Sequence, residues 1–267
     1  MKIAFIGGGV MGEAMIRGIL SKGLATPQDI IANDISPARL ESLKDAYKIV
    51  VTHDHGIAVK GSNVIVIAVK PQNLSELMLE LKDRFVRGQL VLSIVAGASI
   101  ATIANGLGYK SVVRAMPNTP AQVGEGMSVW TASSGVSESQ KEVAKSILGA
   151  LGKEIYVSDE KYINIATAIS GSGPAYIFLV IEALVDAAVH IGWPRERAGE
   201  LVLQTVLGAT RLAQETGKHP AELRNMVTSP GGTTVEGLLQ LEEGGLRALL
   251  THAVIAAYEK AKILGGE

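Results

Sequence analysis

The chain has 267 residues, which is long for one domain and short for three, so we expect two domains. It contains no cysteine, which excludes thiol catalysis, cysteine-ligated zinc, iron–sulfur clusters and disulfides, and fits a reducing compartment, by default the cytoplasm. With 25 Lys+Arg against 26 Asp+Glu and 4% aromatic residues, neither a basic surface nor a base-stacking platform is evident, so we expect no nucleic-acid partner.

Two stretches, Leu90–Tyr109 and Tyr162–Ile181, lack charged residues over about the length of a membrane span. Glycines and a Ser-Gly-Ser-Gly-Pro run interrupt them, so we interpret both as buried strand, turn and helix. The apolar run Ile3–Ile6 is too short for a signal peptide. We therefore expect no membrane partner.

The first half of the chain alternates short β-branched apolar runs with amphipathic stretches. This rhythm is typical of a parallel sheet with helical crossovers. The predicted strands are Lys2–Ile6, Ile30–Asn33, Val64–Val69, Leu90–Ile94, Ser111–Met116 and Ser128–Thr131. Helical spacing predicts helices at Met11–Lys22, Ala38–Tyr47, Leu74–Arg84, Ile100–Leu107 and Ser137–Leu151, the last with Ser137 as N-cap. These elements fit one doubly wound domain.

After Tyr162 the strand signals stop and helical periodicity continues to the end of the chain. Turn residues then separate the predicted helices. These helices are Pro174–Ile191, Arg195–Thr216, Pro220–Met226 and Thr234–Gly265, the last broken near Gly244 and Gly245. We therefore expect residues 163–267 to form an all-helical domain.

The first predicted strand runs into a G-x-G-x-x-G motif formed by Gly7, Gly9 and Gly12, and a helix follows. In this context Gly7 permits a tight turn, Gly9 lets a pyrophosphate approach the backbone, and Gly12 lets helix and strand pack closely. The helix N-terminus adds unpaired N–H groups and a positive dipole. The alternative is a glycine-rich turn without a ligand, but the strand–turn–helix order favours a dinucleotide site.

Asp34 ends the second strand about 20 residues after the glycines, where an acid normally binds the ribose 2′-OH and indicates NAD(H). Asn33, Ser36 and Arg39 could instead hold a 2′-phosphate together. An acid at a strand end is also often only the N-cap of the next helix. The residues leave these alternatives open.

Two loops follow strands at the carboxyl edge of the sheet, where ligands bind in such folds. Ala68–Pro71 contains Lys70, which is either a cation at the site or a solvated lysine before a helix-starting proline. In Arg114–Ala121, two prolines bracket Asn118 and fix a rigid loop. This loop either contacts a nicotinamide or substrate, or only reverses the chain.

Two loops of the helical half, Ser170–Ala175 and Ser229–Thr234, place small residues, hydroxyls and proline ahead of a helix. The second can direct successive backbone N–H groups and hydroxyls at one small anion, such as a substrate carboxylate. Alone, such a loop would more often be only a helix cap.

Four sequence strings follow the glycine motif along the chain, in the order A-V-K-P, R-A-M-P-N-T-P-A, S-G-S-G-P-A-Y and S-P-G-G-T-T. In this order the whole chain resembles the pyrroline-5-carboxylate reductase family, which reduces 1-pyrroline-5-carboxylate to L-proline with NAD(P)H in the last step of proline biosynthesis. The resemblance implies an α/β Rossmann domain with a doubly wound, mainly parallel sheet over residues 1–162. An all-α C-terminal domain for substrate binding and dimerisation would follow over residues 163–267. It also implies NADPH, with NADH as the alternative, no metal, and a homodimer at least, with a decamer as a further assembly.

The resemblance also assigns roles to single residues. Thr234 would act in catalysis by directing its hydroxyl at the imine nitrogen, and it would bind the substrate carboxylate together with Ser229, Gly231, Gly232 and Thr233. The cofactor residues would be Ile6, Gly7, Gly8, Gly9, Val10 and Met11 at the pyrophosphate, Asn33, Asp34, Ser36 and His55 at the adenosine ribose, and Ala68, Val69, Lys70, Pro71, Ile94, Val95, Ala96 and Asn118 around the nicotinamide half. Two positions depart from the family pattern: many members carry Asn at the position of His55, and relatives often carry Arg or a small polar residue at the position of Asp34.

Two other functions share part of this pattern. A β-hydroxyacid dehydrogenase uses a lysine on a long helix of its second domain as acid/base, but no lysine lies between Lys161 and Lys218. A non-catalytic dinucleotide-binding sensor would need the glycine motif but not the two hydroxyl–glycine loops of the helical half. Both features favour the reductase.

Overall fold

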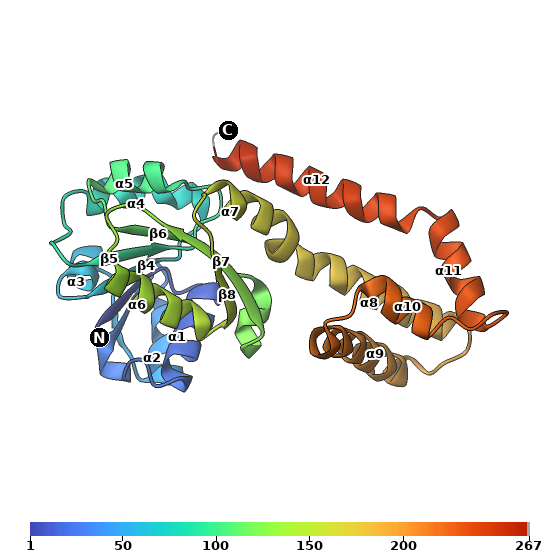
Figure 1. Cartoon of the computed structure of the whole chain (residues 1–267). Coiled ribbons are helices and arrows are strands. Elements are labelled where there is room, and N and C mark those ends of the chain that lie inside the picture. The colour runs from blue at the N-terminus through green and yellow to red at the C-terminus, as the bar shows by residue number, and fades with distance from the viewer. Residues whose placement is uncertain (266–267) are drawn as a thin grey trace. The chain divides into compact units, whose positions relative to one another are not determined.

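The computed structural model describes residues 1–265, which form two compact units (Figure 1). The N-terminal unit comprises Met1–Ser172 and the chain from Ala257 on, and the helical unit comprises Gly173–Ala256. The N-terminal unit thus continues past the predicted boundary after Tyr162, because Ile163 and Ala166 pack against Val129 of the sheet.

The N-terminal unit is built on an eight-stranded sheet of order β3-β2-β1-β4-β5-β6-β7-β8. All neighbouring strands are parallel except β6 and β7, which are antiparallel. The strands are β1 (Ile3–Ile6), β2 (Ile30–Asn33), β3 (Val50–Thr52), β4 (Val64–Ile67), β5 (Leu90–Ser93), β6 (Val112–Met116), β7 (Gly126–Ala132) and β8 (Gly152–Tyr156). The six predicted strands are confirmed, whereas β3 and β8 are additional strands at the two edges.

Helices cover both faces of this sheet, as the doubly wound fold requires. They are α1 (Val10–Ser21), α2 (Pro37–Tyr47), α3 (His55–Val59), α4 (Leu74–Leu81), α5 (Ile100–Leu107) and α6 (Glu138–Gly149), with short 3-10 helices η1 (Pro27–Asp29), η2 (Pro71–Asn73) and η3 (Thr119–Val123). Ser137 caps α6 as predicted, because its side chain accepts a hydrogen bond from the Gln140 N–H. The short helix α3 is the only α-helix of Met1–Leu151 that the sequence pattern does not predict.

Alternation along each buried strand divides the hydrophobic core between the two faces. On β1, Phe5 packs with residues of α1, α2 and α6, whereas its neighbour Ile6 packs with residues of α3, α4 and α5. Because both faces are covered, every residue of β1 is fully buried. The carboxyl end of β1 is therefore fixed in the centre of the sheet, where the glycine motif follows.

One continuous helical run leads out of this unit. It consists of α7 (Lys161–Ala166), a π-helical turn (Thr167–Gly171) and α8 (Gly173–His190). The predicted loop at Ser170–Ala175 is thus wrong, because the chain there is helical: Ser170 and Gly171 belong to the π-helical turn and α8 begins at Gly173. The Thr167 and Ser170 hydroxyls donate to the Ile163 and Ala166 carbonyls one turn back. By length and composition alone, Lys161–His190 is long and apolar enough to cross a membrane.

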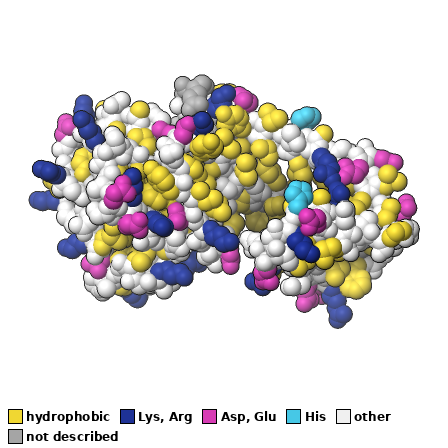
Figure 2. All heavy atoms as spheres, viewed as in Figure 1, with side chains coloured by type: hydrophobic (Ala, Val, Ile, Leu, Met, Phe, Trp, Pro, Cys, Tyr) yellow, Lys and Arg dark blue, Asp and Glu magenta, His cyan; other side chains and the backbone are white. Residues whose placement is uncertain are grey.

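The helical unit leaves most of its apolar side chains exposed. Its other helices are α9 (Arg195–Thr216), α10 (Pro220–Met226), α11 (Thr233–Glu243) and α12 (Leu246–Gly265), of which α12 ends in the N-terminal unit. Among its described hydrophobic residues only Ala198 and Val202 are buried, and hydrophobic side chains reach its surface in Figure 2. The expectation that Tyr162–Ile181 is buried holds for Ile163, Ala166 and Ala168. It is wrong for the α8 part of the stretch in the isolated chain, in which Phe178 and Leu179 are 62% and 64% exposed.

Candidate functional site

Two of the three motif glycines are required by close packing. Gly7 has φ +103°, and a Cβ there would lie 2.6 Å from the Ala68 carbonyl oxygen. A Cβ on Gly12 would lie 2.5 Å from the carbonyl oxygen of Gly7. Both positions therefore exclude any larger residue, for the reasons that the motif predicts.

The third glycine opens the loop to a ligand. Gly9 is the N-cap of α1, makes no side-chain cap, and has no atom within 4 Å of an ideal Cβ. The first N–H groups of a helix have no partner within it, and here they belong to Val10 and Met11. Because the positive end of the helix dipole lies at the same place, the loop fits the pyrophosphate of a dinucleotide. Ile6 is fully buried and can contribute only its backbone.

Asp34 fixes this loop from the end of β2. Its Oδ2 accepts a hydrogen bond from the Gly8 N–H at 2.8 Å, and its Oδ1 accepts one from the Ser36 N–H at 2.9 Å. The alternative that Asp34 caps the next helix is wrong, because Ser36 is the N-cap of α2 and accepts from the Arg39 N–H. Asp34 therefore holds two backbone turns together at the predicted ribose position.

Arg39 contacts the same loop from the other side. Its Nε donates to the Gly8 carbonyl, and its Nη2 contacts Oε2 of Glu13. The Tyr47 hydroxyl donates to Oε1 of Glu13 at 2.9 Å. The hydrogen bond from Arg39 lowers the pKa of the Glu13 carboxyl, with a smaller contribution from Tyr47. Arg39 is therefore paired with a carboxylate rather than being a free cation.

The remaining predicted ribose residues lie at the ends of β2 and β3. Asn33 is buried, and its Nδ2 donates to the Thr52 carbonyl at 3.1 Å, which ties the two strands together. His55 is the first residue of α3, and its Nδ1 lies 2.7 Å from Oε2 of Glu80 on α4. A hollow of about 460 Å³ adjoins this pair and is lined by His53, Asp54, His55, Gly56, Glu80 and Arg84.

The residues predicted around the nicotinamide follow β4 and β5. The Ala68 N–H donates to the Ile6 carbonyl, so the loop after β4 starts beside the glycine motif. The Ile94 N–H donates to the Ile67 carbonyl, so the loop after β5 starts beside the loop after β4. Lys70 is exposed and precedes the proline that starts η2, an arrangement that also fits its interpretation as a solvated lysine. The structure thus brings the predicted residues Ala68, Val69, Lys70, Pro71, Ile94, Val95 and Ala96 to the same edge of the sheet as the glycine loop.

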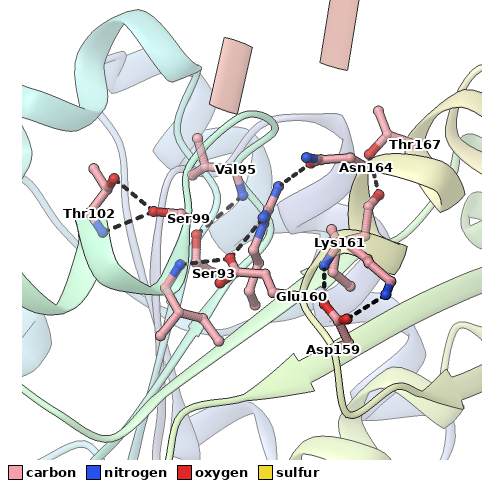
Figure 3. A network of polar contacts seen from close by, with 12 residues as sticks. Ser93, Val95, Ser99, Thr102, Asp159, Glu160, Lys161, Asn164 and Thr167 are labelled. Atoms are coloured by element: carbon pink, nitrogen blue, oxygen red, sulfur yellow. Dashed lines mark hydrogen bonds and ion pairs between the residues drawn. The ribbon is translucent and has the colours of Figure 1, made fainter. Parts of the chain in front are cut away.

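A buried polar network that sequence reasoning missed supports this edge (Figure 3). Arg114 on β6 donates from Nη1 to Oε1 of Glu160 at 2.8 Å and from Nη2 to Oδ1 of Asn164 at 3.0 Å. The same Glu160 oxygen accepts the backbone N–H of Ile100, the first residue of α5. The signal in the sequence was an arginine inside an otherwise apolar strand, since a buried charge needs a partner.

Asn118 makes a second link of this kind. Its Nδ2 donates to the Ser170 carbonyl at 3.0 Å, and its Oδ1 accepts from the Met127 N–H at 2.8 Å. Both ends of its amide are thus occupied within the chain, which supports a structural role for the loop. Its predicted contact with the cofactor stays a prediction.

The Ser229–Thr234 loop lies in the helical unit and ends in the exposed N-terminus of α11. Gly231 has φ +66°, and the Gly232 N–H donates to the Ser229 carbonyl at 3.0 Å. Gly232 is the N-cap of α11 and offers no side chain, so the first helical N–H groups, those of Thr233 and Thr234, have no partner within the helix. This geometry can receive a small anion.

Residues 1–265 contain no group of three or more His, Cys, Asp or Glu side chains that could hold a metal ion.

Comparisons with known proteins agree with both units. Residues 160–264 match a family model described as pyrroline-5-carboxylate reductase dimerisation, and residues 2–97 match one described as NADP oxidoreductase, coenzyme F420-dependent. The chain is 43% identical to the pyrroline-5-carboxylate reductase of Methanosarcina acetivorans, over 99% of this chain and 98% of that protein. The chain belongs to the pyrroline-5-carboxylate reductase family. The family model for residues 160–264 also supports oligomerisation through the helical half.

Two solved structures of this family show the same fold. A pyrroline-5-carboxylate reductase from Coxiella burnetii superposes with a TM-score of 0.90 at 42% identity, covering 98% of each chain. The Plasmodium falciparum pyrroline carboxylate reductase, solved with NADP bound, superposes with a TM-score of 0.91 at 32% identity, covering 99% of this chain and 98% of that one. These matches confirm the predicted fold class, a Rossmann domain followed by a helical dimerisation domain.

Proposed function

We propose that this protein is a pyrroline-5-carboxylate reductase, an oxidoreductase of amino-acid biosynthesis that reduces 1-pyrroline-5-carboxylate to L-proline with NAD(P)H. The observation that supports it best is the 43% identity to a pyrroline-5-carboxylate reductase over 99% of the chain. The open N-terminus of α1 at Gly9 agrees with it, because such a terminus binds a dinucleotide pyrophosphate. The β-hydroxyacid dehydrogenase alternative is disfavoured by the same family assignment.

In this proposal the cofactor supplies the hydride, and the N-terminal unit orients it. Gly9, Val10 and Met11 would present backbone N–H groups to the pyrophosphate, whereas the Gly8 N–H is already bonded to Asp34. Asp34 and Ser36 would lie at the ribose. The loops after β4 and β5 would line the nicotinamide side. The NADP bound to the Plasmodium falciparum relative supports NADPH, and NADH is the alternative that Asp34 supports.

The Ser229–Thr234 loop would hold the substrate. The N–H groups of Thr233 and Thr234 at the start of α11 would bind the carboxylate. The Thr234 hydroxyl would donate a hydrogen bond to the imine nitrogen, which gains electron density as the hydride reaches the adjacent carbon. If the imine binds as iminium, its N–H would instead donate to the Thr234 hydroxyl oxygen, and the reaction requires no strong general acid.

The helical unit would form a homodimer, which could assemble further into a decamer. The exposed apolar helices support this, because within the unit only Ala198 and Val202 are buried among the described hydrophobic residues. Pairing of copies would also cover α8, so we propose no membrane partner for Lys161–His190. Nucleic acid is disfavoured by the net charge of −1, and the lack of cysteine supports a cytoplasmic enzyme.

A spectrophotometric assay tests the proposed function. Protein, NADPH and 1-pyrroline-5-carboxylate are mixed, the absorbance of the reduced cofactor is followed, and L-proline is quantified. Cofactor consumption that depends on the imine and matches proline formation supports the proposal. Binding of NADPH without consumption would instead identify a dinucleotide sensor.

A further inference from the structure

Arg39 and Glu13 form an ion pair beside the glycine loop. Arg39 is the third residue of α2, and Glu13 lies in the first half of α1. The guanidinium is also fixed on the loop, since Nε donates to the Gly8 carbonyl and Nη2 to the Gly9 carbonyl at 3.4 Å. The two side chains are 27% and 32% exposed, so ligands and water can reach them.

A second carboxylate, that of Asp34, contacts the loop residue Gly8, which Arg39 also contacts. The Gly8 N–H donates to Asp34, while the Gly8 carbonyl accepts from Arg39. An ideal Cβ on Gly8 would lie 3.5 Å from Asp34 Oδ2 and 3.8 Å from Arg39 Cγ, so both side chains pass close to one point of the backbone. Arg39 thus pairs with Glu13 and shares the loop residue Gly8 with Asp34, and Tyr47 holds the Glu13 carboxylate in place.

NADP(H) differs from NAD(H) by a phosphate on the ribose 2′-oxygen, and this part of the fold lies next to that position. In dinucleotide-binding folds, an acid at the end of the second strand binds the ribose 2′-OH, whereas a nearby arginine accommodates a 2′-phosphate. A phosphomonoester carries about −1.5 to −2 charges at pH 7. A 2′-phosphate here would meet Asp34 and would have to compete with Glu13 for the guanidinium of Arg39.

We propose that Glu13 is a specificity-determining residue, which weakens the binding of 2′-phosphorylated coenzyme by holding and neutralising Arg39. Glu13 lies on α1 and not on the segment after β2, so the usual search for an acid or arginine at that strand end does not reveal it. The inference rests on the proposed function, since it requires a dinucleotide at the glycine loop. It predicts that removing the carboxylate shifts the preference toward NADP(H) and leaves NAD(H) binding unchanged.

Calorimetric titration of the ligand-free protein tests this without turnover. The dissociation constants of NADP⁺ and NAD⁺ are measured for the wild type and Glu13→Gln. We expect Glu13→Gln to bind NADP⁺ about fivefold more tightly, the upper range for one partly exposed ion pair, and to keep NAD⁺ affinity within about twofold. The gain should shrink as ionic strength rises.

Three variants separate this effect from others. Glu41→Gln removes the same charge from an exposed position of α2 and should change neither constant. The double variant Glu13→Gln/Arg39→Gln should lose the gain in NADP⁺ affinity, because the arginine proposed to bind the 2′-phosphate is gone. Glu13→Met is a second neutral replacement with good helix propensity, to be used if Glu13→Gln melts at a much lower temperature.

Two results would overturn the inference. One is a ratio of the two dissociation constants that changes less than about twofold in both neutral Glu13 variants. The other is a gain in NADP⁺ affinity that persists without Arg39. If the wild type bound neither coenzyme, the proposed function would fall as well; if it bound both and reduced the imine, only the role of Glu13 would be rejected.

Discussion

Oε1 of Glu160 lies 2.8 Å from Nη1 of Arg114 and accepts the Ile100 N–H at the same distance (Figure 3). One carboxylate oxygen therefore joins strand β6, the start of α5 and the residue that precedes α7. Asn118 adds a parallel link from the β6–η3 loop to the π-helical turn at Ser170. The edge of the sheet that carries the candidate cofactor loops is thus hydrogen-bonded to α7 and the π-helical turn, the segment that leads into α8.

We predict that Glu160→Ala destabilises the protein strongly. The change leaves the buried guanidinium of Arg114 without its carboxylate, and a buried charge that loses its partner costs about 3–5 kcal/mol. Because the Glu160 side chain is 32% exposed, we expect about 2–3 kcal/mol, or a Tm lower by roughly 5–10 °C at fixed protein concentration. Glu125→Ala, at an exposed position, is the matched control and should change Tm little. Equal Tm values for both variants would show that the network adds no stability.

The fold was largely predictable because its central strands are apolar on both faces. Ile65 and Val66, for example, lie on opposite faces of β4 and are both buried, so their run signals a strand without ambiguity. The edge strands carry no such signal: β3 has three residues, and β8 exposes Lys153, Ile155 and Tyr156. These two strands form because β3 pairs with β2 and β8 pairs with β7. Such pairing is a tertiary effect that the local sequence pattern does not indicate.

The candidate site was predictable where chemistry depends on backbone. Gly7 and Gly12 allow no side chain, because an added Cβ would lie 2.6 Å and 2.5 Å, respectively, from a backbone carbonyl oxygen, and the motif spacing alone indicates them. Side-chain partners were not predictable, because they join residues far apart in the sequence. Arg39 with Glu13, His55 with Glu80 and Arg114 with Glu160 all depend on how separate helices pack on the sheet.

A second prediction concerns Thr234, half-buried in the first turn of α11. Thr234→Val keeps the shape of the side chain but removes the hydroxyl proposed to hydrogen-bond the imine nitrogen. We expect kcat/KM for the imine to fall by about 30–150-fold, equivalent to about 2–3 kcal/mol, with the cofactor dissociation constant little changed. Thr234→Ser, which keeps a hydroxyl, should retain most activity. An unchanged kcat/KM in Thr234→Val would remove Thr234 from the mechanism.

The third prediction concerns Asp34, whose carboxylate should repel a 2′-phosphate. We expect usable activity with NADH beside NADPH in the wild type. Asp34→Ser should raise the ratio of kcat/KM for NADPH to that for NADH. Because Asp34 also accepts from Gly8 and Ser36, Asp34→Asn is the control that loses the charge but keeps one acceptor oxygen. A constant ratio in both variants would show that the carboxylate acts only on the loop.

The fourth prediction is a pH dependence from Glu13. Its hydrogen bond with Arg39 lowers the pKa of Glu13 in the folded protein below 4.5, so the folded state favours the ionised form. The stability from this pair is therefore fully present above the unfolded pKa and is lost as pH falls through the lower folded value. The Tm difference between wild type and Glu13→Gln should be constant from about pH 6 to 8 and should vanish in acid. A difference that grew toward low pH would contradict the assignment.

The last prediction is that the active unit is at least a homodimer built from the helical half. Helices α8, α9 and α12 expose Phe178, Leu179, Leu203 and Leu249 among many apolar side chains, more than a small helical layer can leave in water. Covering them calls for an obligate interface above roughly 2,000 Å², and a protein of this kind has no stable folded monomer. Light scattering during dilution should therefore show loss of structure and activity together as the oligomer dissociates. Leu249→Glu places a charge on this surface and should raise the protein concentration below which the oligomer dissociates and activity is lost. Glu243→Gln, at an exposed polar position, should leave that concentration unchanged. A folded and active species of 28.0 kDa would disprove the prediction.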